Sequence, residues 1–234
     1  MNNQQWIERA RDFGAKLSTT RVDAFETYFR EMVTWNELTN LTSIVEHDSV
    51  VIKHFLDSLS LAPIFLDVKS LIDIGSGAGF PGLALKIVRP DLRVILLEAT
   101  GKKVAFLNHI IATLNLRDVG AIHARAEELG HHPEHREQYD AAVGRAVAEL
   151  ATLSEYALPF VQVGGIFVAQ KGILISNEIE RAHNAISTLG GRFRETIPVS
   201  LPDLEQRHLI VIEKVSHTPS QYPRRAGIPK KKPL

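Results

Sequence analysis

The first 65 residues have the hydrophobic spacing of short helices. In residues 21–38 the apolar side chains recur at steps of three and four, as one face of an amphipathic helix requires: Val22, Phe25, Phe29, Met32, Val33 and Leu38. Residues 45–61 repeat this spacing, and Thr20 or Ser18 is placed to cap the first helix. The pattern predicts a helical N-terminal cap over residues 1–65.

From Leu71 the spacing changes, and short apolar runs alternate with helical patterns at 101–115 and 146–158. The predicted strands are Leu71–Ile74, Arg93–Glu98, Ala121–His123, Ala141–Val143, Gly165–Gln170, a segment near Arg192–Pro198, and Leu209–Lys214. Strands separated by helices indicate right-handed crossovers and a parallel sheet covered on both faces. We therefore expect an α/β fold over 66–216, doubly wound and mostly parallel, with the final strand antiparallel at an edge.

Composition narrows the class of protein. Apolar residues make up 44% and charged residues 23% of the 234 residues, as in globular chains. No run reaches the roughly 18 apolar residues of a membrane span, and the N-terminus lacks the pattern of a signal peptide, so we expect a cytoplasmic protein. The absence of cysteine removes disulfides, thiol nucleophiles and Cys-ligated metals. We expect a monomer, although no motif bears on the oligomeric state.

Charge is balanced over the whole chain but not along it. There are 27 basic and 27 acidic residues, and five of the basic ones and none of the acidic ones lie in 217–234. This Pro-rich C-terminal segment carries +5, and the remaining 22 basic and 27 acidic residues carry −5. A local cationic segment of this kind suits a polyanionic partner.

A glycine-rich loop follows the first predicted strand. Gly75, Gly77, Gly79 and Gly82 lie between an apolar strand and a helix, where glycine permits a sharp turn and close approach of a ligand to main-chain N–H groups. The segment 77–82 satisfies the dinucleotide pattern G-x-G-x-x-G, but that pattern should begin at Gly75. The loop therefore predicts a nucleotide site. Its glycines begin at a different position relative to the strand end than those of the dinucleotide enzymes.

Two carboxylates accompany the loop. Asp73, two residues before Gly75, would repel a pyrophosphate and attract a cationic amino group. Glu98 ends the next strand, 23 positions after Gly75, where a doubly wound fold places the acid that binds ribose hydroxyls. A solvated acid at a helix start is the alternative for Glu98. Together these residues resemble the S-adenosylmethionine site of class I methyltransferases.

Metal binding and phosphate binding by a P-loop have weaker support in the sequence. His131, His132 and His135 suggest a metal, but Pro133 breaks helical pairing of the histidines, so we predict a solvated loop and no metal. Lys86 falls too late to be the lysine of a phosphate-binding P-loop.

With these residues in place, the sequence resembles the RsmG, or GidB, family of bacterial ribosomal RNA methyltransferases over nearly its whole length. The resemblance rests on ordered motifs: Trp35-Asn36, Asn40–Thr42, His54–Leu59, Asp73–Gly82, Ile87–Pro90, Gly101–Lys103, Ala126-Glu127, Arg145-Ala146, Lys171-Gly172, Arg207-His208 and Tyr222–Pro229. It implies methyl transfer from S-adenosylmethionine to N7 of one guanine in 16S ribosomal RNA of the small subunit.

The resemblance also implies roles for individual residues. Gly75 and Phe80, with Gly77 and Gly79, would form the cofactor loop. Ala126 and Glu127 would meet the adenine, Glu98 would hold the ribose, and Arg145 would lie by the cofactor at the substrate opening. Because guanine N7 carries a lone pair and no proton, the transfer needs no general base, and we assign Arg145 to positioning. An ordinary ion pair is the alternative for Arg145.

Basic residues along the chain are candidates for the RNA backbone. We predict this role for Lys53, His54, Lys171, Arg207, Arg224, Arg225, Lys230, Lys231 and Lys232. For His54 and its neighbour Phe55, core packing is an equal alternative, because they share an apolar helix face. Whether naked RNA or an assembled particle is the substrate stays open.

Three other functions fit part of the pattern. A class I methyltransferase could act on a small molecule or a protein, with the N-terminal helices as a lid. An NAD-dependent oxidoreductase would share the glycine loop, and a noncatalytic RNA-binding module could retain the cofactor pocket. The basic C-terminal segment and the breadth of the resemblance favour the RNA methyltransferase.

Overall fold

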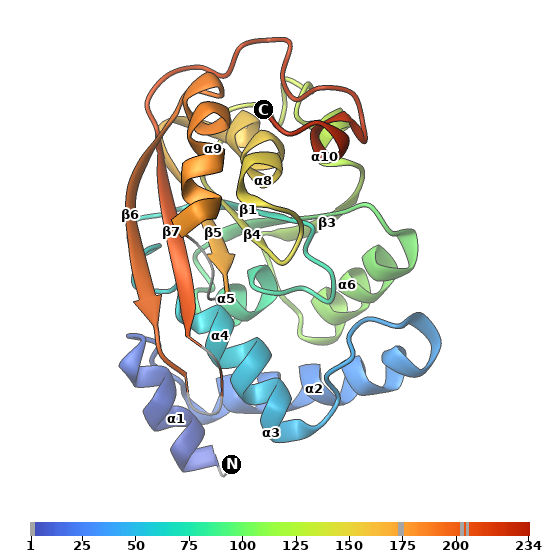
Figure 1. The fold of residues 1–234 in the computed structure, drawn as a ribbon. Coiled ribbons are helices and arrows are strands. Elements are labelled where there is room, and N and C mark those ends of the chain that lie inside the picture. Colours follow the sequence, from blue (N-terminus) through green and yellow to red (C-terminus); the bar gives the residue numbers. More distant parts are fainter. Residues whose placement is uncertain (1–2, 173–175, 202–203, 205) are drawn as a thin grey trace.

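The computed structural model describes residues 3–172, 176–201, 204 and 206–234. The N-terminal helices lie at one end of the molecule and the C-terminal segment at the opposite end, with the sheet between them (Figure 1). Of the described helices, none is long and apolar enough to cross a membrane.

The N-terminal cap is helical, as the hydrophobic spacing predicts. Its elements are α1 (Asn3–Asp12), α2 (Thr19–Thr39), α3 (His47–Val50), a π-helical turn over Val51–Leu56, and α4 (Asp57–Leu59). Ser18 caps α2, where its hydroxyl accepts a hydrogen bond from the Arg21 amide over 3.3 Å. The predicted helix over 45–61 is therefore one helical run whose middle turn is widened.

The described strands form one seven-stranded sheet in the order β3-β2-β1-β4-β5-β7-β6. Their bounds are β1 (Ser70–Ile74), β2 (Arg93–Glu98), β3 (Val119–His123), β4 (Tyr139–Arg145), β5 (Val161–Lys171), β6 (Gly191–Val199) and β7 (Arg207–Lys214). Strands β1 to β5 pair in parallel, and β7 is antiparallel to both of its neighbours. The antiparallel final strand is confirmed, but its predicted place at an edge is wrong, because β6 pairs outside it.

Helices cover both faces of the sheet. The remaining ones are α5 (Gly82–Val88), α6 (Gly101–Thr113), α7 (Ala126–Leu129), α8 (Leu150–Ala157), a short 3-10 turn over Leu158–Phe160, α9 (Ser176–Thr188) and α10 (Ile228–Lys231). Leu71 and Ile72, adjacent in β1, belong to two separate hydrophobic clusters because successive strand residues point to opposite faces. The N-terminal helices, α5 and α6 pack on the Leu71 side, and α7, α8 and α9 on the Ile72 side.

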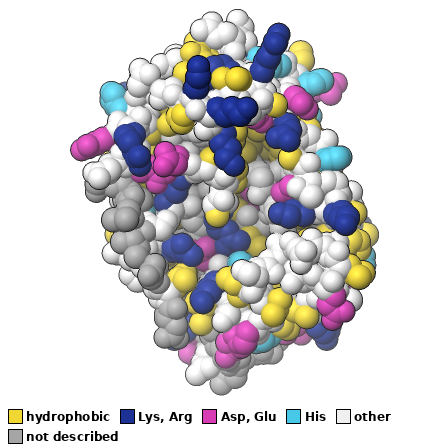
Figure 2. Space-filling view, turned by 45° about the vertical axis from the view of Figure 1, so that its right-hand side comes forward, with side chains coloured by type: hydrophobic (Ala, Val, Ile, Leu, Met, Phe, Trp, Pro, Cys, Tyr) yellow, Lys and Arg dark blue, Asp and Glu magenta, His cyan; other side chains and the backbone are white. Residues whose placement is uncertain are grey.

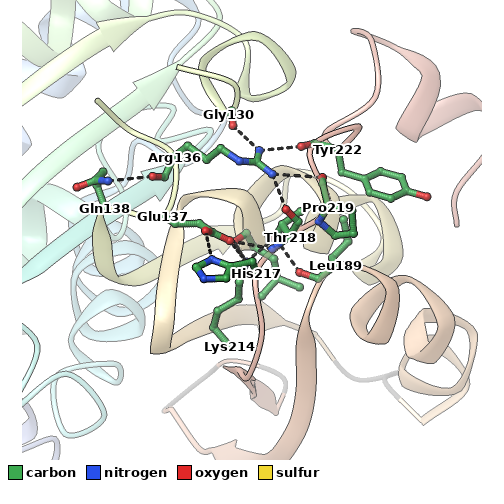
Figure 3. A network of polar contacts seen from close by, with 11 residues as sticks. Gly130, Arg136, Glu137, Gln138, Leu189, Lys214, His217, Thr218, Pro219 and Tyr222 are labelled. Atoms are coloured by element: carbon green, nitrogen blue, oxygen red, sulfur yellow. Dashed lines mark hydrogen bonds and ion pairs between the residues drawn. The ribbon is translucent and has the colours of Figure 1, made fainter. Parts of the chain in front are cut away.

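The C-terminal segment, residues 217–234, begins in a polar network (Figure 3). The Arg136 guanidinium donates to main-chain oxygens of Gly130, Thr218, Pro219 and Tyr222 over 2.7–3.2 Å. Glu137 accepts from the His217 ring, the Thr218 amide and the Lys214 ammonium. The segment therefore begins attached to the folded body.

Further contacts continue along this segment. The carbonyl of Pro229 accepts from the Thr152 hydroxyl over 3.0 Å, and the Pro229 ring is buried. The amide of Gly227 donates to the Glu127 carboxylate over 3.0 Å. The cationic C-terminal segment predicted from the sequence is packed along α7 and α8, because its main-chain groups pair with side chains of the body.

Candidate active site

The polar residues of the site lie at the carboxyl ends of the parallel strands, next to the start of β7. Arg145 at the end of β4 pairs in register with Gln170 in β5, and Lys171 pairs with His208 in β7. In open α/β sheets, ligands bind outside the carboxyl ends of the strands. The sheet therefore brings these side chains to the carboxyl ends of the strands, where the glycine loop also lies.

The glycine loop turns directly out of β1. The amides of Gly75 and Ser76 both donate to the Leu97 carbonyl, over 2.8 and 3.1 Å, which fixes the loop against β2. Gly75 has φ of +69°, and a Cβ added there would lie 2.8 Å from a methyl carbon of Val147. A side chain at this position would therefore strain the backbone and collide with the loop after β4.

Glu98 lies against the loop at the end of β2. One carboxylate oxygen accepts from the Gly77 amide over 3.0 Å, and the other accepts from the Thr100 amide over 2.8 Å. The side chain is buried, and each oxygen keeps a further lone pair after these bonds. A carboxylate held in this way can accept hydrogen bonds from the hydroxyls of a ribose.

Asp73 is fully buried at the base of the loop. Its Oδ2 accepts from the Gly82 amide over 2.8 Å, whereas Oδ1 has no hydrogen-bond partner among the described residues. Burial raises the pKa of this carboxyl to about 7, against the opposing effects of the Gly82 bond and Arg145. A cationic group brought next to Oδ1 would favour the ionised carboxylate.

A pocket of about 210 Å³, here called the glycine-loop pocket, opens between the ends of β1 and β2 and the start of α7. Its lining includes Gly75, Leu97, Ala126, Glu127 and Val147. Glu127 is buried and accepts the Gly227 amide, so the C-terminal segment contacts one wall residue. The lining combines apolar side chains with a few polar ones, as a site for a flat purine ring would.

A second pocket of about 270 Å³, here called the cationic pocket, lies between the N-terminal cap and the ends of β4 and β5. Its lining residues are Ile44, Lys53, His54, Asp57, Arg145, Ala146, Gln170, Lys171, Gly172 and Arg207. Four of these are lysine or arginine and one is acidic. Figure 2 shows one face of the molecule, on which Lys and Arg side chains gather above and below a central hollow.

Arg145 is held in the cationic pocket by several contacts. Its guanidinium donates to Oδ2 of Asp57 over 3.0 Å and to the Lys53 carbonyl over 3.2 Å. It also lies 5.2 Å from the centre of the Phe80 ring, within the range of a cation–π contact. The ion pair that was the alternative for Arg145 is therefore present, and its place at the substrate opening stays a prediction.

His54 and Phe80 form a stacked pair beside Arg145. Their ring centres are 4.7 Å apart at an interplanar angle of 18°, and Tyr28 stacks on Phe80 at 5.2 Å. Burial, with the nearby Arg145, lowers the pKa of His54 to about 4, so this imidazole is neutral near pH 7. Phe55, next in the chain, is buried in the core, so core packing holds for Phe55, and the RNA contact of His54 stays a prediction.

The two pockets meet at the loop after β4. Arg145 and Ala146 line the cationic pocket, and the next residue, Val147, lines the glycine-loop pocket. Ala146 has φ of +54°, a left-handed conformation that is uncommon for a residue with a side chain. Ligands in the two pockets would therefore contact neighbouring residues of the same loop.

The structure brings some of the predicted site residues together and leaves others apart. Lys53, His54, Lys171 and Arg207 line one pocket, although they come from three elements. Asp73, Gly77, Gly79, Phe80 and Glu98 are not among the residues that line the glycine-loop pocket. Phe80 instead supports the cationic pocket through its contacts with His54 and Arg145.

The basic residues of the C-terminal segment divide into two kinds. Arg225, Lys230, Lys231 and Lys232 are exposed. Arg224 instead pairs with the buried Glu155 over 2.6 Å and also donates its main-chain amide to that carboxylate over 2.7 Å. Its guanidinium is engaged within the protein, so we omit Arg224 from the proposed RNA contacts.

Two polar residues of the cationic pocket were not identified as site residues from the sequence. Asp57 lies in the motif His54–Leu59, next to the apolar Phe55 and Leu56, and Gln170 lies near the carboxyl end of a strand. A charged residue beside apolar ones and a polar residue at a strand end were the available signals. Neither signal shows that the two residues meet.

Comparison with known proteins shows the family. Residues 21–210 match the family model GidB, described as rRNA small subunit methyltransferase G. The chain belongs to the GidB family. A ribosomal RNA small subunit methyltransferase G from Roseiflexus sp. (strain RS-1) is 51% identical over 97% of this chain and 98% of its own length. A protein of the same name from Acetivibrio thermocellus is 46% identical over 97% of this chain and 95% of its own length.

Solved structures share the fold of this GidB-family chain. A precorrin-6y C5,15-methyltransferase from Geobacter metallireducens aligns with a TM-score of 0.52 at 15% identity, over 68% of this chain and 86% of that chain. An rRNA methylase from Streptococcus thermophilus aligns with a TM-score of 0.50 at 17% identity, over 68% and 97%. These similarities confirm the predicted class I methyltransferase fold.

Proposed function

We propose that this protein transfers a methyl group from S-adenosylmethionine to N7 of one guanine in 16S ribosomal RNA. The observation that carries the proposal is the arrangement of the two pockets. A nucleoside-sized pocket beside the glycine loop and a cationic pocket beside Arg145 meet at a single loop. Membership of the GidB family supports the same activity.

The residues around the glycine loop fit S-adenosylmethionine. Glu98 presents a fixed carboxylate for the ribose, and Ala126 and Glu127 line the part of the pocket proposed for adenine. Asp73 supplies a buried carboxylate oxygen without a partner among the described residues, which suits the ammonium of the methionine moiety. A buried carboxylate at the base of the loop would oppose a pyrophosphate, so this site favours a phosphate-free nucleoside.

The chemistry demands positioning more than proton transfer. When bound, S-adenosylmethionine would supply a methyl group on a positively charged sulfur. Guanine N7 has a lone pair and no proton, so the N7–methyl bond could form as the sulfur–methyl bond breaks and S-adenosylhomocysteine leaves. The protein must then hold the purine in line with the methyl group, and such positioning supplies roughly 7–11 kcal/mol of a barrier. Arg145 is suited to this task because Asp57, Lys53 and Phe80 hold its guanidinium in place.

The charges of the cationic pocket suit both the RNA and the product. The purine becomes positively charged on methylation, so a neutral His54 beside it opposes the reaction less than an imidazolium would. Asp57 offsets the charge of Arg145 at 3.0 Å. Lys53 and Arg207 are proposed to contact RNA phosphates, together with the exposed Arg225 and Lys230. Lys171 is omitted for the same reason as Arg224, because its ammonium donates to the Ala148 carbonyl and to the Glu178 carboxylate over 2.6 Å each.

The decisive experiment is methylation with purified components. The protein is incubated with methyl-labelled S-adenosylmethionine and either free 16S RNA or small ribosomal subunits from cells that lack the gene, and the nucleosides are analysed by mass spectrometry. We expect 7-methylguanosine at one position, and the more reactive substrate identifies the natural form of the RNA. Unmodified guanine with both substrates would contradict the proposal and favour a methyltransferase of another substrate class.

Cofactor choice is tested separately by calorimetry. S-adenosylhomocysteine should bind with one site per chain, and NADH should not bind.

We also propose that the protein acts as a monomer, because residues of one chain line both pockets. Sedimentation during turnover tests the oligomeric state.

A further inference from the structure

One short helix forms part of the wall of the glycine-loop pocket. This helix is α7, and Ala126 and Glu127 at its start are among the lining residues. A helix of four residues has too few internal hydrogen bonds to be stable alone, so contacts with other elements must fix its position. The shape of the pocket therefore depends on what holds α7.

The C-terminal segment holds the start of α7. The amide of Gly227 donates to Oε1 of Glu127 over 3.0 Å. The hydroxyl of Tyr156 in α8 donates to the same carboxylate, and Tyr156 also lines the pocket. Glu127 is buried, so these donors replace the water that an exposed carboxylate would bind. Two elements therefore fix the Glu127 side chain at the pocket.

The same segment holds the end of α7, and Figure 3 shows part of this contact. The Arg136 guanidinium donates to the carbonyl of Gly130, directly after α7, and to the carbonyl of Tyr222, over 2.8 Å each. The Pro223 carbonyl accepts from the His131 ring over 2.7 Å. A Cβ added to Gly130 would lie 2.9 Å from a carbon of the Pro223 ring, so this ring packs directly on the glycine.

The segment is itself anchored on α8. Arg224 pairs with the buried Glu155 over 2.6 Å, and the Pro229 carbonyl accepts from the Thr152 hydroxyl over 3.0 Å. Gly227 lies between these two anchors and has φ of +83°, a left-handed conformation that glycine adopts readily. The two anchors and the turn at Gly227 therefore set the position of the amide that binds Glu127.

We infer that the C-terminal segment is part of the cofactor site, an inference that rests on the proposed function. None of its residues lines either pocket, so it acts by holding Ala126 and Glu127 in the geometry that receives the nucleoside. A ligand that binds to a mobile wall must first order that wall, which lowers affinity. The Gly227 amide is thus a positioning group that acts through Glu127. The exposed cations of the same segment stay available to RNA.

Truncation of the chain tests this role. Truncation after Ala226 removes Gly227 and the Pro229 contact but keeps Arg224. We expect the affinity for S-adenosylhomocysteine, measured by calorimetry, to fall at least ~5-fold, on the scale of one hydrogen bond to a buried charged group. Truncation after Lys232 is the matched control, because it shortens the chain and keeps both contacts, so its affinity should equal that of the full chain. Equal affinities for all three proteins would overturn the inference.

A double-mutant cycle separates positioning from a general loss of stability. Glu127→Ala is compared with and without truncation after Ala226. If the segment acts through Glu127, truncation should weaken S-adenosylhomocysteine binding much less in Glu127→Ala than in the chain that has Glu127. The same fold loss in both backgrounds would show that the segment only stabilises the fold, and the inference would be wrong.

The full chain supplies a further test that does not depend on how a variant folds. Coupling between two parts of a protein is reciprocal, so binding of S-adenosylhomocysteine should slow amide hydrogen exchange in residues 222–232, although these residues do not line the pocket. Exchange that is unchanged by a saturating amount of S-adenosylhomocysteine would contradict the inference. A full chain that does not bind S-adenosylhomocysteine at all contradicts the proposed function instead.

Discussion

Arg145 donates a hydrogen bond to Oδ2 of Asp57 over 3.0 Å, and the two residues are 88 positions apart in the chain. Asp57 begins α4 of the N-terminal cap, and Arg145 ends β4 of the sheet. The ion pair therefore joins the helical cap to the sheet edge where the two pockets meet. It holds one guanidinium in a fixed place without covalent attachment.

Replacing Arg145 by Ala should lower turnover at least ~10-fold, or about 1.4 kcal/mol in the barrier, because the purine loses a positioning contact. RNA affinity should change modestly, since Lys53 and Arg207 remain. Single-turnover methylation and filter binding measure the two quantities. Arg145→Lys is the control, and it should also be slow because lysine lacks the planar fork that pairs with Asp57. Unchanged turnover of Arg145→Ala would refute the role.

Affinity for S-adenosylmethionine should depend on pH through Asp73. Burial raises the pKa of Asp73 to about 7 in the free protein, and an ammonium next to Oδ1 favours the ionised form. Binding should therefore release a proton below pH 7, and affinity should fall up to about tenfold per pH unit as the pH decreases. Calorimetry between about pH 5.5 and 7.5, in buffers of different ionisation enthalpy, measures both effects.

Asp73→Asn is the matched variant for this pH dependence. It should bind more weakly and show a flat affinity below pH 7, because the amide does not titrate. An equally steep pH dependence in Asp73→Asn would show that another group causes it. Unfolding experiments supply a second check: a carboxyl whose pKa is raised on folding lowers stability as pH rises from about 4 to 7, and the variant should lack this slope.

Arg224 and Arg225 should differ sharply in their effect on stability. Arg224→Ala leaves the Glu155 carboxylate, which is 0% exposed, without its charged partner, and should cost about 3 kcal/mol of unfolding free energy. For a chain of this length that corresponds to a decrease in Tm of roughly 6–12 °C. Arg225→Ala removes an exposed side chain and should change the unfolding free energy by less than about 0.5 kcal/mol. Equal Tm values for the two variants would contradict the structural role of Arg224.

The exposed cations of the C-terminal segment should instead affect RNA binding. Replacing Arg225, Lys230, Lys231 and Lys232 by Gln should weaken binding and flatten the plot of log K against log salt, because fewer counterions are released. Each phosphate of single-stranded RNA that these cations no longer neutralise should reduce the slope by about 0.7. Binding measured from about 50 to 300 mM salt tests this. The same slope in the variant and the wild-type protein would exclude these residues from the interface.

Several parts of the fold follow from local sequence. The helix over 21–38 and the strand Arg93–Glu98 were predictable because their apolar spacing matches the period of each element. The glycine loop and Glu98 were predictable because a turn out of a strand and an acid at the next strand end are short-range patterns. The position of β7 between β5 and β6 was not predictable, because the pairing order of strands depends on contacts between distant segments.

The residues of the cationic pocket show the limit of such reasoning. Lys53 and Arg207 are readily proposed as RNA contacts because their charge is visible in the sequence. Asp57 and Gln170 gain significance only through what surrounds them, since Asp57 pairs with Arg145 over 3.0 Å and with Arg207 over 3.8 Å, and Gln170 donates to the Asp57 carbonyl over 2.7 Å. Hydrogen-bond satisfaction is a property of atoms brought together from separate elements, and no local pattern encodes it.

Local sequence thus specified the elements, the class I methyltransferase core and the family of this protein, because periodicity and short motifs act over a few residues. Folding decided which charges are free and which are engaged. Arg224 and Arg225 are adjacent and chemically identical, yet one pairs with a buried carboxylate and the other faces solvent. The difference arises because Glu155, 69 residues away in the chain, is brought to only one of them.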